Sequence, residues 1–262
     1  GLSFIHISNF EPFMPRGLSG VFEGAALIFF AYGGYARVTT VAEEVKDASR
    51  TIPRAIVLAL AISTVLYVFI SFIAMGLVGS QSLAASDSPL ADAIGVTGNA
   101  AAVFVVSLGA MIATASVLLM TILGMSRMTF AMARNGQLPT FLSWIHLRFH
   151  TPKYAVWATG ALSSILVFAD FSRVVAVGTF ALLFHHALVN LAAVKLRAEN
   201  RRYPVFVSVL GLLLCLVLLA FLSIDTWVIG IAGLTAGSFY YAMVEAKKQK
   251  KTLHTSLLKN LL

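Results

Sequence analysis

The stretch FFAYGGY, residues 29–35, places two adjacent glycines inside a long apolar run. Each glycine in a helix interior costs about 1 kcal/mol relative to alanine, so Gly33 and Gly34 weaken a helix near its centre. In a bilayer, irregular backbone persists only where it is buried in protein or lines a water-filled cavity. Two interpretations follow. Either the helix is broken into halves near 18–30 and 36–46 to bind a ligand, or the small residues let a neighbouring helix approach.

The chain around this stretch has the composition of an integral membrane protein. Of its 262 residues, 59% are hydrophobic and 11% are charged, and the mean hydropathy is +0.88. Its one cysteine, Cys215, lies in an apolar run and excludes a disulfide framework. Apolar stretches long enough to cross about 30 Å of hydrocarbon predict seven spans. We place them near 18–42, 53–78, 99–126, 152–169, 172–194, 204–223 and 226–245.

Basic residues are unequally distributed over the connecting segments. The segments after the first, third and fifth spans are basic, as is the tail with KKQKK (247–251), whereas the other segments hold only Arg16 and Arg173. By the positive-inside rule, residues 1–17 are extracellular and 246–262 cytoplasmic, in a single transmembrane domain of the plasma membrane. The net charge of +8 then reflects topology and membrane lipid contact, not a nucleic-acid partner.

The predicted orientation has a consequence for the N-terminus. Nothing before the first span has the charged and apolar regions of a signal peptide, yet the N-terminus is expected outside. An odd number of preceding spans would explain this. The sequence therefore predicts a missing N-terminal half as a partner of this chain.

Three strings in order resemble amino acid permeases of the amino acid–polyamine–organocation superfamily. FEGAALIFFAYGGYARVTTVAEEVKDASRTIPRAI (22–56) is similar to the family's sixth helix and the loop after it. SLGAMIATASVLLMTILGMSRMTFAMARNGQLP (107–139) resembles the eighth helix, and LVNLAAVKLRAENRRYP (188–204) the end of the tenth. The resemblance implies an all-α, broken-helix, inverted-repeat fold of the leucine-transporter type, with helices six to twelve here. The family's glycine-broken first helix has no counterpart, and KDASR stands where the family commonly has Asn-Pro.

The resemblance also implies a substrate site at the glycine pair. It implies amino acid transport by alternating access, coupled to protons or to exchange. The substrate ammonium would meet carbonyls of Phe30, Ala31 and Gly33, with Gly34 completing the unwound segment. Phe30 or Tyr32 would supply an aromatic wall or gate, where a cation–π contact is worth roughly 0.5–2 kcal/mol.

Glu23 is an acidic residue inside the first predicted span. It precedes Phe30 by seven residues, so both lie on one helical face. A carboxylate at mid-membrane costs about 2.5–3.5 kcal/mol, and less near an interface. Three interpretations stay open: an outer carboxylate that attracts cationic substrates, a proton-coupling acid, or an interfacial residue in water.

Hydroxyl residues form a stripe in the third predicted span. Ser107, Thr114 and Thr121 recur every seven residues, and Ser116 lies beside them. In related sodium-coupled transporters the matching helix gives hydroxyl oxygens to a cation, so Thr114 and Ser116 are candidate coupling residues. The alternative is hydrogen bonding within the helix or between helices.

His185 and His186 lie mid-span, with Asn190 one turn beyond His186. A buried histidine can relay a proton, which makes His185 a candidate coupling residue. The alternative is packing, with hydrogen bonds to Asn190 or backbone. GLTAG (233–237) in the last span is interpreted as a helix-packing pair.

No enzyme or metal motif is recognisable. G-x-S-x-G, Walker A, H-E-x-x-H and paired-cysteine patterns are absent from the sequence. His146 and His150 have the spacing of a helical metal pair but lack a third ligand, which favours a loop. We therefore predict no catalytic residue, metal or cofactor. The main alternative from another class is a half-length protein that does not transport alone, and assembles with a separate half or acts as a sensor. A channel is less favoured because nothing resembles a selectivity filter.

Overall fold

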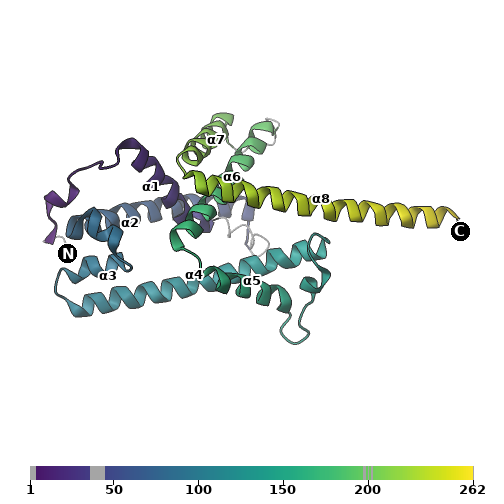
Figure 1. The fold of residues 1–262 in the computed structure, drawn as a ribbon, viewed down its shortest axis with the longest axis horizontal. Coiled ribbons are helices and arrows are strands. Elements are labelled where there is room, and N and C mark those ends of the chain that lie inside the picture. Colours follow the sequence, from purple (N-terminus) through teal and green to yellow (C-terminus); the bar gives the residue numbers. More distant parts are fainter. Residues whose placement is uncertain (1–3, 36–44, 197–198, 200, 202, 262) are drawn as a thin grey trace. The chain divides into compact units, whose positions relative to one another are not determined.

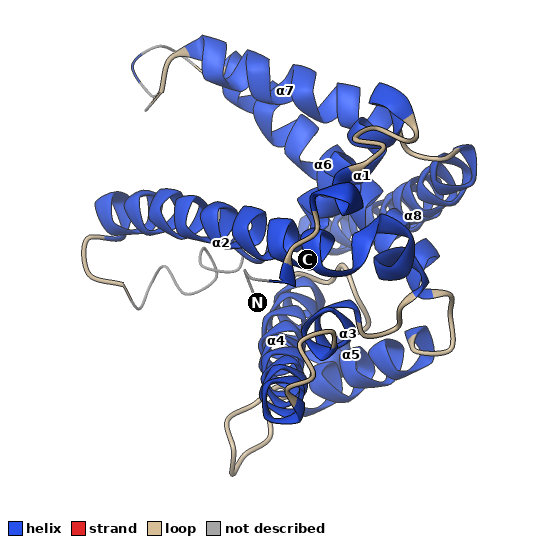
Figure 2. Ribbon diagram, turned by 90° about the vertical axis from the view of Figure 1, so that its left-hand side faces the viewer, coloured by secondary structure: helices blue, strands red, loops and turns tan. Residues whose placement is uncertain are grey.

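The computed structural model describes residues 4–35, 45–196, 199, 201 and 203–261, with side chains up to residue 246. All regular elements in this part are helices, and Figure 2 shows helices and loops without a strand. In chain order (Figure 1) they are η2 (Ile7–Phe10), α1 (Gly17–Ala31), α2 (Ala48–Ala85), α3 (Pro89–Gly95), α4 (Ala100–Arg134), η4 (Thr140–Ser143), α5 (Lys153–Leu166), α6 (Phe171–Lys195), α7 (Val205–Ala220) and α8 (Ile224–Leu261).

The all-α class predicted from the sequence is confirmed, and each of the seven predicted spans overlaps one described helix. Five described segments are long and apolar enough to cross a membrane. They are Gly17–Tyr35, Ala48–Ala85, Ala100–Arg134, Phe171–Lys195 and Ile224–Ala246. The helix α7 is apolar but has 16 residues, and α5 has 14, or about 21 Å at the rise of an α-helix. That α5 and α7 cross the membrane stays a prediction.

The chain forms two compact units. Residues 1–21 and 32–121 make one, and residues 22–31 and 122–262 make the other. The chain passes from the second unit to the first between Ala31 and Tyr32, inside the stretch FFAYGGY.

The first unit is organised around a kink in α2. Gly79 has φ 77° and ψ 167°, which no helix allows and which glycine adopts without strain. The backbone N–H of His6 and the side-chain amide of Asn9 both donate to the carbonyl oxygen of Gly76, at 2.9 and 2.8 Å. These bonds satisfy a carbonyl at the point where the helical ladder is interrupted. Phe10 stacks on Phe72 with 5.0 Å between ring centroids, so η2 lies against α2.

The second unit has its core between α6 and its neighbours α7 and α8. Phe180 and Leu183 of α6 and Leu219 of α7 are almost fully buried. Phe180 meets Trp227 of α8 edge to face at 5.2 Å, and the Trp227 indole N–H donates to the Leu219 carbonyl at 2.9 Å. Ala26 of α1 belongs to the same buried cluster. The core therefore lies where large side chains of α7 and α8 pack against one face of α6.

Small residues allow these close approaches. The ring of Phe180 covers Gly230 of α8, and a Cβ at that position would overlap the ring. Asn190 of α6 covers Gly211 of α7 in the same way, with 2.7 Å from such a Cβ to Oδ1. The prediction that GLTAG is the packing pair is wrong within the described part of the chain. Gly233 and Gly237 have no atom of another described segment within 4 Å of a Cβ position.

Candidate functional site

The helix α1 ends at the predicted break. Its α-helical backbone stops at Ala31, Tyr32 forms a turn, and residues 33–35 continue as a 3-10 turn. Gly34 is open, with no described atom within 4 Å of a Cβ position. The second half-helix predicted at 36–46 lies largely outside the described residues, so it stays a prediction.

The residues before the break contact α6. The rings of Phe29 and His186 are perpendicular, with their centroids 5.4 Å apart. The Phe30 ring covers Gly178, where a Cβ would lie 2.7 Å from Cε2, yet 44% of Phe30 remains exposed. This placement agrees with Glu23 and Phe30 sharing the face that looks toward α6.

Of the two mid-span histidines, His186 faces α1. His185 is exposed, whereas His186 is half-buried against Phe29. The His186 Nδ1 lies 2.7 Å from the carbonyl oxygen of Leu182 in a hydrogen bond. The Asn190 amide donates to the backbone carbonyl of His186 at 2.9 Å. The contacts of His186 and Asn190 fit the packing interpretation, and the role proposed for His185 stays a prediction.

The first residue after the end of α1 is held by α2. The Tyr32 hydroxyl donates to Oγ1 of Thr64 at 3.1 Å, and Thr64 in turn donates to the carbonyl of Leu60 at 2.8 Å. The Tyr32 ring meets Tyr67 edge to face at 5.3 Å. Two contacts thus fix Tyr32 on one face of α2.

The hydroxyl candidates of α4 bond to their own helix. Thr114 donates to the carbonyl of Ala110 at 2.8 Å, and Ser116 donates to that of Ile112 at 2.9 Å. Both residues are exposed. Their hydroxyl hydrogens are satisfied as the alternative interpretation expects, while the oxygen lone pairs remain available as acceptors.

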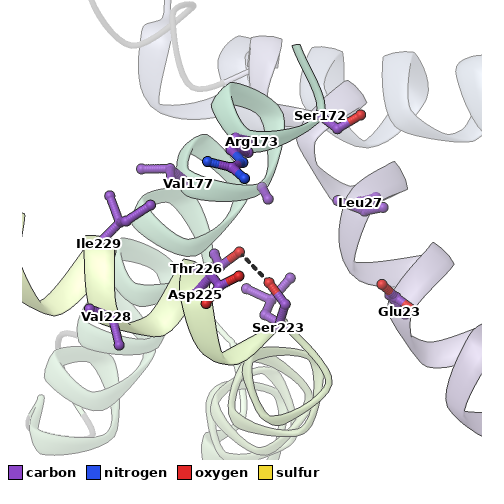
Figure 3. Close-up of a pocket in the computed structure, with 12 residues that line it drawn as sticks. Glu23, Leu27, Ser172, Arg173, Val177, Ser223, Asp225, Thr226, Val228 and Ile229 are labelled. Carbon is purple, nitrogen blue, oxygen red and sulfur yellow. Dashed lines mark hydrogen bonds between the residues drawn. The ribbon is translucent and has the colours of Figure 1, made fainter. Parts of the chain in front are cut away.

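Glu23 lines a pocket in the second unit with a volume of about 530 Å³ (Figure 3). The pocket lies between α1, the first turns of α6, the turn after α7 and the start of α8. Leu27, Val177 and Ile229 contribute apolar walls. The charged and hydroxyl residues that line it are Glu23, Ser172, Arg173, Ser223, Asp225 and Thr226.

Local hydrogen bonds shape this pocket. The Asp170 carboxylate caps α6 by accepting from the backbone N–H of Arg173 at 2.9 Å, as expected for aspartate at an N-cap. The hydroxyls of Ser223 and Thr226 share a hydrogen bond of 2.8 Å, which fixes the turn between α7 and α8. Thr226 is buried, whereas Arg173 and Asp225 are exposed and Glu23 is half-buried.

Sequence reasoning singled out Glu23 but not its partners in the pocket. Arg173 is one of only two basic residues in the segments predicted to be extracellular, and Asp225 is also in one of them. The scarcity of charged residues in those segments is the feature of the sequence that could have identified Arg173 and Asp225. The sequence did not reveal that the beginning of α6 and the beginning of α8 meet Glu23. The predicted loop position of His146 and His150 is confirmed.

Comparison with known proteins gives a consistent result. A family model described as "Amino acid permease" matches residues 2–247. An uncharacterised transporter of Mycobacterium tuberculosis is 37% identical over 86% of this chain and 51% of its own length. The branched-chain amino acid permease of Bacillus subtilis is 30% identical over 94% of this chain and 55% of its own length. The methylthioribose transporter of the same organism is 31% identical over 94% and 55%. The chain thus spans about half the length of these relatives.

Proposed function

Because the chain belongs to the amino acid permease family, we propose that it carries amino acids across a membrane by alternating access. The substrate binds at the unwound segment of residues 30–34. Transport is coupled to proton symport or to amino acid exchange. The membrane is the plasma membrane, with the N-terminus outside and the C-terminus in the cytoplasm, as the distribution of Lys and Arg indicates.

The observation that carries this proposal is the end of α1 at Ala31, inside a membrane-length segment. The last four carbonyl groups of a helix have no intrahelical donor, and the helix dipole gives that end a partial negative charge of about half an elementary charge. A primary ammonium satisfies those carbonyls and that charge together. The end of α1 is therefore suited to the ammonium of an amino acid.

The aromatic residues beside the break give the substrate site its walls. Phe30 leans on Gly178 and keeps 44% of its surface exposed, so its ring can cover a ligand at the helix end. Tyr32 is anchored through Thr64 and Tyr67 of α2. Alternating access requires the chain on either side of the helix end at Ala31 to move, and Phe30 and Tyr32 contact different helices, α6 and α2.

The relatives' names leave two chemical classes of cargo. The named relatives include a branched-chain amino acid permease and a methylthioribose transporter. Methylthioribose is a neutral sugar without an ammonium, so it makes no use of a helix C-terminus as a cation site. The chemistry of the break favours the amino acid.

Uptake into proteoliposomes by the native polypeptide tests the proposal. A panel of labelled amino acids and methylthioribose identifies the cargo, and runs with a pH gradient or with preloaded amino acid separate symport from exchange. The variant Gly34→Leu should reduce binding at least about 100-fold, because the side chain occupies the ligand's space and favours a continuous helix.

Gly233→Leu is the matched control for this test. Neither glycine has a described atom within 4 Å of a Cβ position, so both variants should fold and melt like the native protein. Gly233 is far along the chain from the break and should leave uptake unchanged. Undiminished substrate binding by Gly34→Leu would show that the break is not the substrate site.

A further inference from the structure

We propose that the pocket lined by Glu23, Arg173 and Asp225 is a second binding site, for a small zwitterion with a primary ammonium and an oxyanion. Where that ligand is the transported amino acid, the inference rests on the proposed function. The site is distinct from the break. Glu23 precedes Phe30 by seven residues, about 10 Å along α1, so the head group of one amino acid cannot occupy both places.

The charges of the pocket define the ligand. No ion pair joins Glu23, Arg173 and Asp225 to one another in the described structure, so both signs remain available to a guest (Figure 3). A guanidinium presents a planar fork of N–H donors that matches a carboxylate or a phosphate. The two carboxylates accept from an ammonium. A ligand of one sign would leave part of this lining unused, whereas a zwitterion uses both.

In the described structure, the hydrogen bonds around the pocket do not involve the Arg173 guanidinium. Asp170 is the acidic residue nearest to Arg173 in sequence, and its carboxylate already accepts from the Arg173 backbone N–H. Ser223 and Thr226 are engaged with each other and hold the turn that carries Asp225. These bonds hold the two turns that carry Arg173 and Asp225, and neither bond uses the Arg173 guanidinium or the Asp225 carboxylate.

The size and position of the pocket suit a small ligand. Its volume of about 530 Å³ lies in the usual range of small-molecule pockets, about 300–1,000 Å³. It lies at the N-terminal end of α6, whereas Lys195 and Arg201 are at the other end, where Arg201 donates to the carbonyl of Val194. In the proposed topology it opens to the extracellular side. Glu23 is then an outer carboxylate that binds an ammonium.

Two sources supply this ligand chemistry. One is a free amino acid on its way to the break, and the other is the head group of an aminophospholipid such as phosphatidylethanolamine. The experiment uses the native polypeptide in nanodiscs of phosphatidylglycerol, which has no ammonium, with or without phosphatidylethanolamine. Equilibrium binding of the labelled amino acid identified by uptake, leucine if none is, gives the number of ligands per chain. Native mass spectrometry gives the retained lipid.

The expected result is about two amino acids per chain, or retained phosphatidylethanolamine that competes for one of them. Arg173→Met and Asp225→Asn should each weaken the pocket site about 10- to 100-fold and leave the other site unchanged. Arg173→Lys should weaken the pocket site less than Arg173→Met does, because lysine keeps the positive charge but lacks the planar fork of donors. Gly34→Leu should remove the other ligand and leave the pocket occupied.

Matched controls come from the same predicted face of the membrane. Arg16→Met and Asp87→Asn make the same chemical changes outside the pocket and should leave binding intact. The exposed positions of Arg173 and Asp225 make misfolding easy to distinguish, because the variants should melt like the native protein.

The possible failures are distinguishable. Unchanged amino acid binding and lipid retention in Arg173→Met and Asp225→Asn would overturn the pocket site while leaving transport intact. Absence of any uptake, together with lipid retention that depends on Arg173, would overturn the proposed function and support the pocket. Absence of uptake, amino acid binding and lipid retention would overturn both.

Discussion

The helices α4 and α6 are both long and apolar, yet they are packed differently. Within its most apolar stretch α6 has 22% of its residues buried, whereas the corresponding stretch of α4, although more apolar, has none. The buried residues of α6 lie along one face: Thr179, Phe180, Leu183 and Ala187. Lipid tails are as apolar as leucine, so apolarity places a helix in the membrane but does not place it in a bundle. Pairs of large and small residues distinguish α6 from α4.

The largest effect is expected where the α6 bundle is tightest. Gly230→Leu puts a side chain where the Phe180 ring lies, and Phe180 is 1% exposed and cannot move away. We expect a loss of about 3 kcal/mol of stability, or failure to assemble. Gly109→Leu makes the same change in α4. No described atom of another segment lies within 4 Å of a Cβ at Gly109, so this variant should stay stable. Unfolding midpoints in detergent would compare the two, and equal shifts would contradict the distinction between α4 and α6.

A smaller effect is expected at the contact of α6 with α7. The methyl group of Gly211→Ala would lie 2.7 Å from Oδ1 of Asn190. Either the Asn190 side chain then gives up the hydrogen bond that its Nδ2 donates to the His186 carbonyl, or α7 moves away. We expect a loss of about 1–2 kcal/mol. In the double variant with Asn190→Ala the overlap disappears, so the two losses should not add. Additive losses in the same unfolding assay would mean that this contact is not tight.

A single hydrogen bond of the bundle should be worth still less. Trp227→Phe keeps an aromatic ring against Phe180 but removes the N–H that donates to Leu219. The expected cost is about 1 kcal/mol, because the Leu219 carbonyl loses one hydrogen bond and keeps the bond from the Leu222 backbone N–H. Trp157 of α5 is 70% exposed, and Trp157→Phe should change stability by less than about 0.5 kcal/mol. A larger cost for Trp157→Phe would reveal packing on α5.

The smallest effect is expected on α4. Thr114→Val and Ser116→Ala remove hydroxyls that bond only to the preceding turn, so stability should change by less than about 0.5 kcal/mol. The native and variant proteins should each take up substrate as fast in choline medium as in sodium medium. A native rate that depends on sodium, together with a variant rate that does not, would support the ion site considered for Thr114 and Ser116.

The sequence predicts the features of this protein that depend on local properties. The helix end at Ala31 follows from two adjacent glycines, and the order of the helices follows from apolar runs between charged segments. The predictions that were wrong or incomplete concern which residues lie in contact in the fold. GLTAG has the small-residue spacing of a packing pair, but Gly230, one turn earlier, is the residue that meets Phe180. Likewise, nothing in FHHAL distinguishes His186, which meets Phe29, from the exposed His185.

The pocket shows the same limit for the candidate site. Glu23 is identifiable because a carboxylate in an apolar span is costly wherever the chain folds. Arg173 and Asp225 are ordinary loop-end residues until α6 and α8 bring them to α1, and they lie 150 and 202 positions beyond Glu23 in the sequence. Hydropathy and spacing carry no information on contacts at that separation.

The bonds that join His6 and Asn9 to the carbonyl of Gly76 also limit how far α1 can travel. Between Phe10, which is stacked on Phe72, and the first residue of α1 at Gly17 there are only six residues. Fully extended, that connection reaches about 25 Å. While the contacts at Gly76 hold, the beginning of α1 stays within this radius of α2. The position of the first residue of α1 is therefore bounded by chain length as well as by packing.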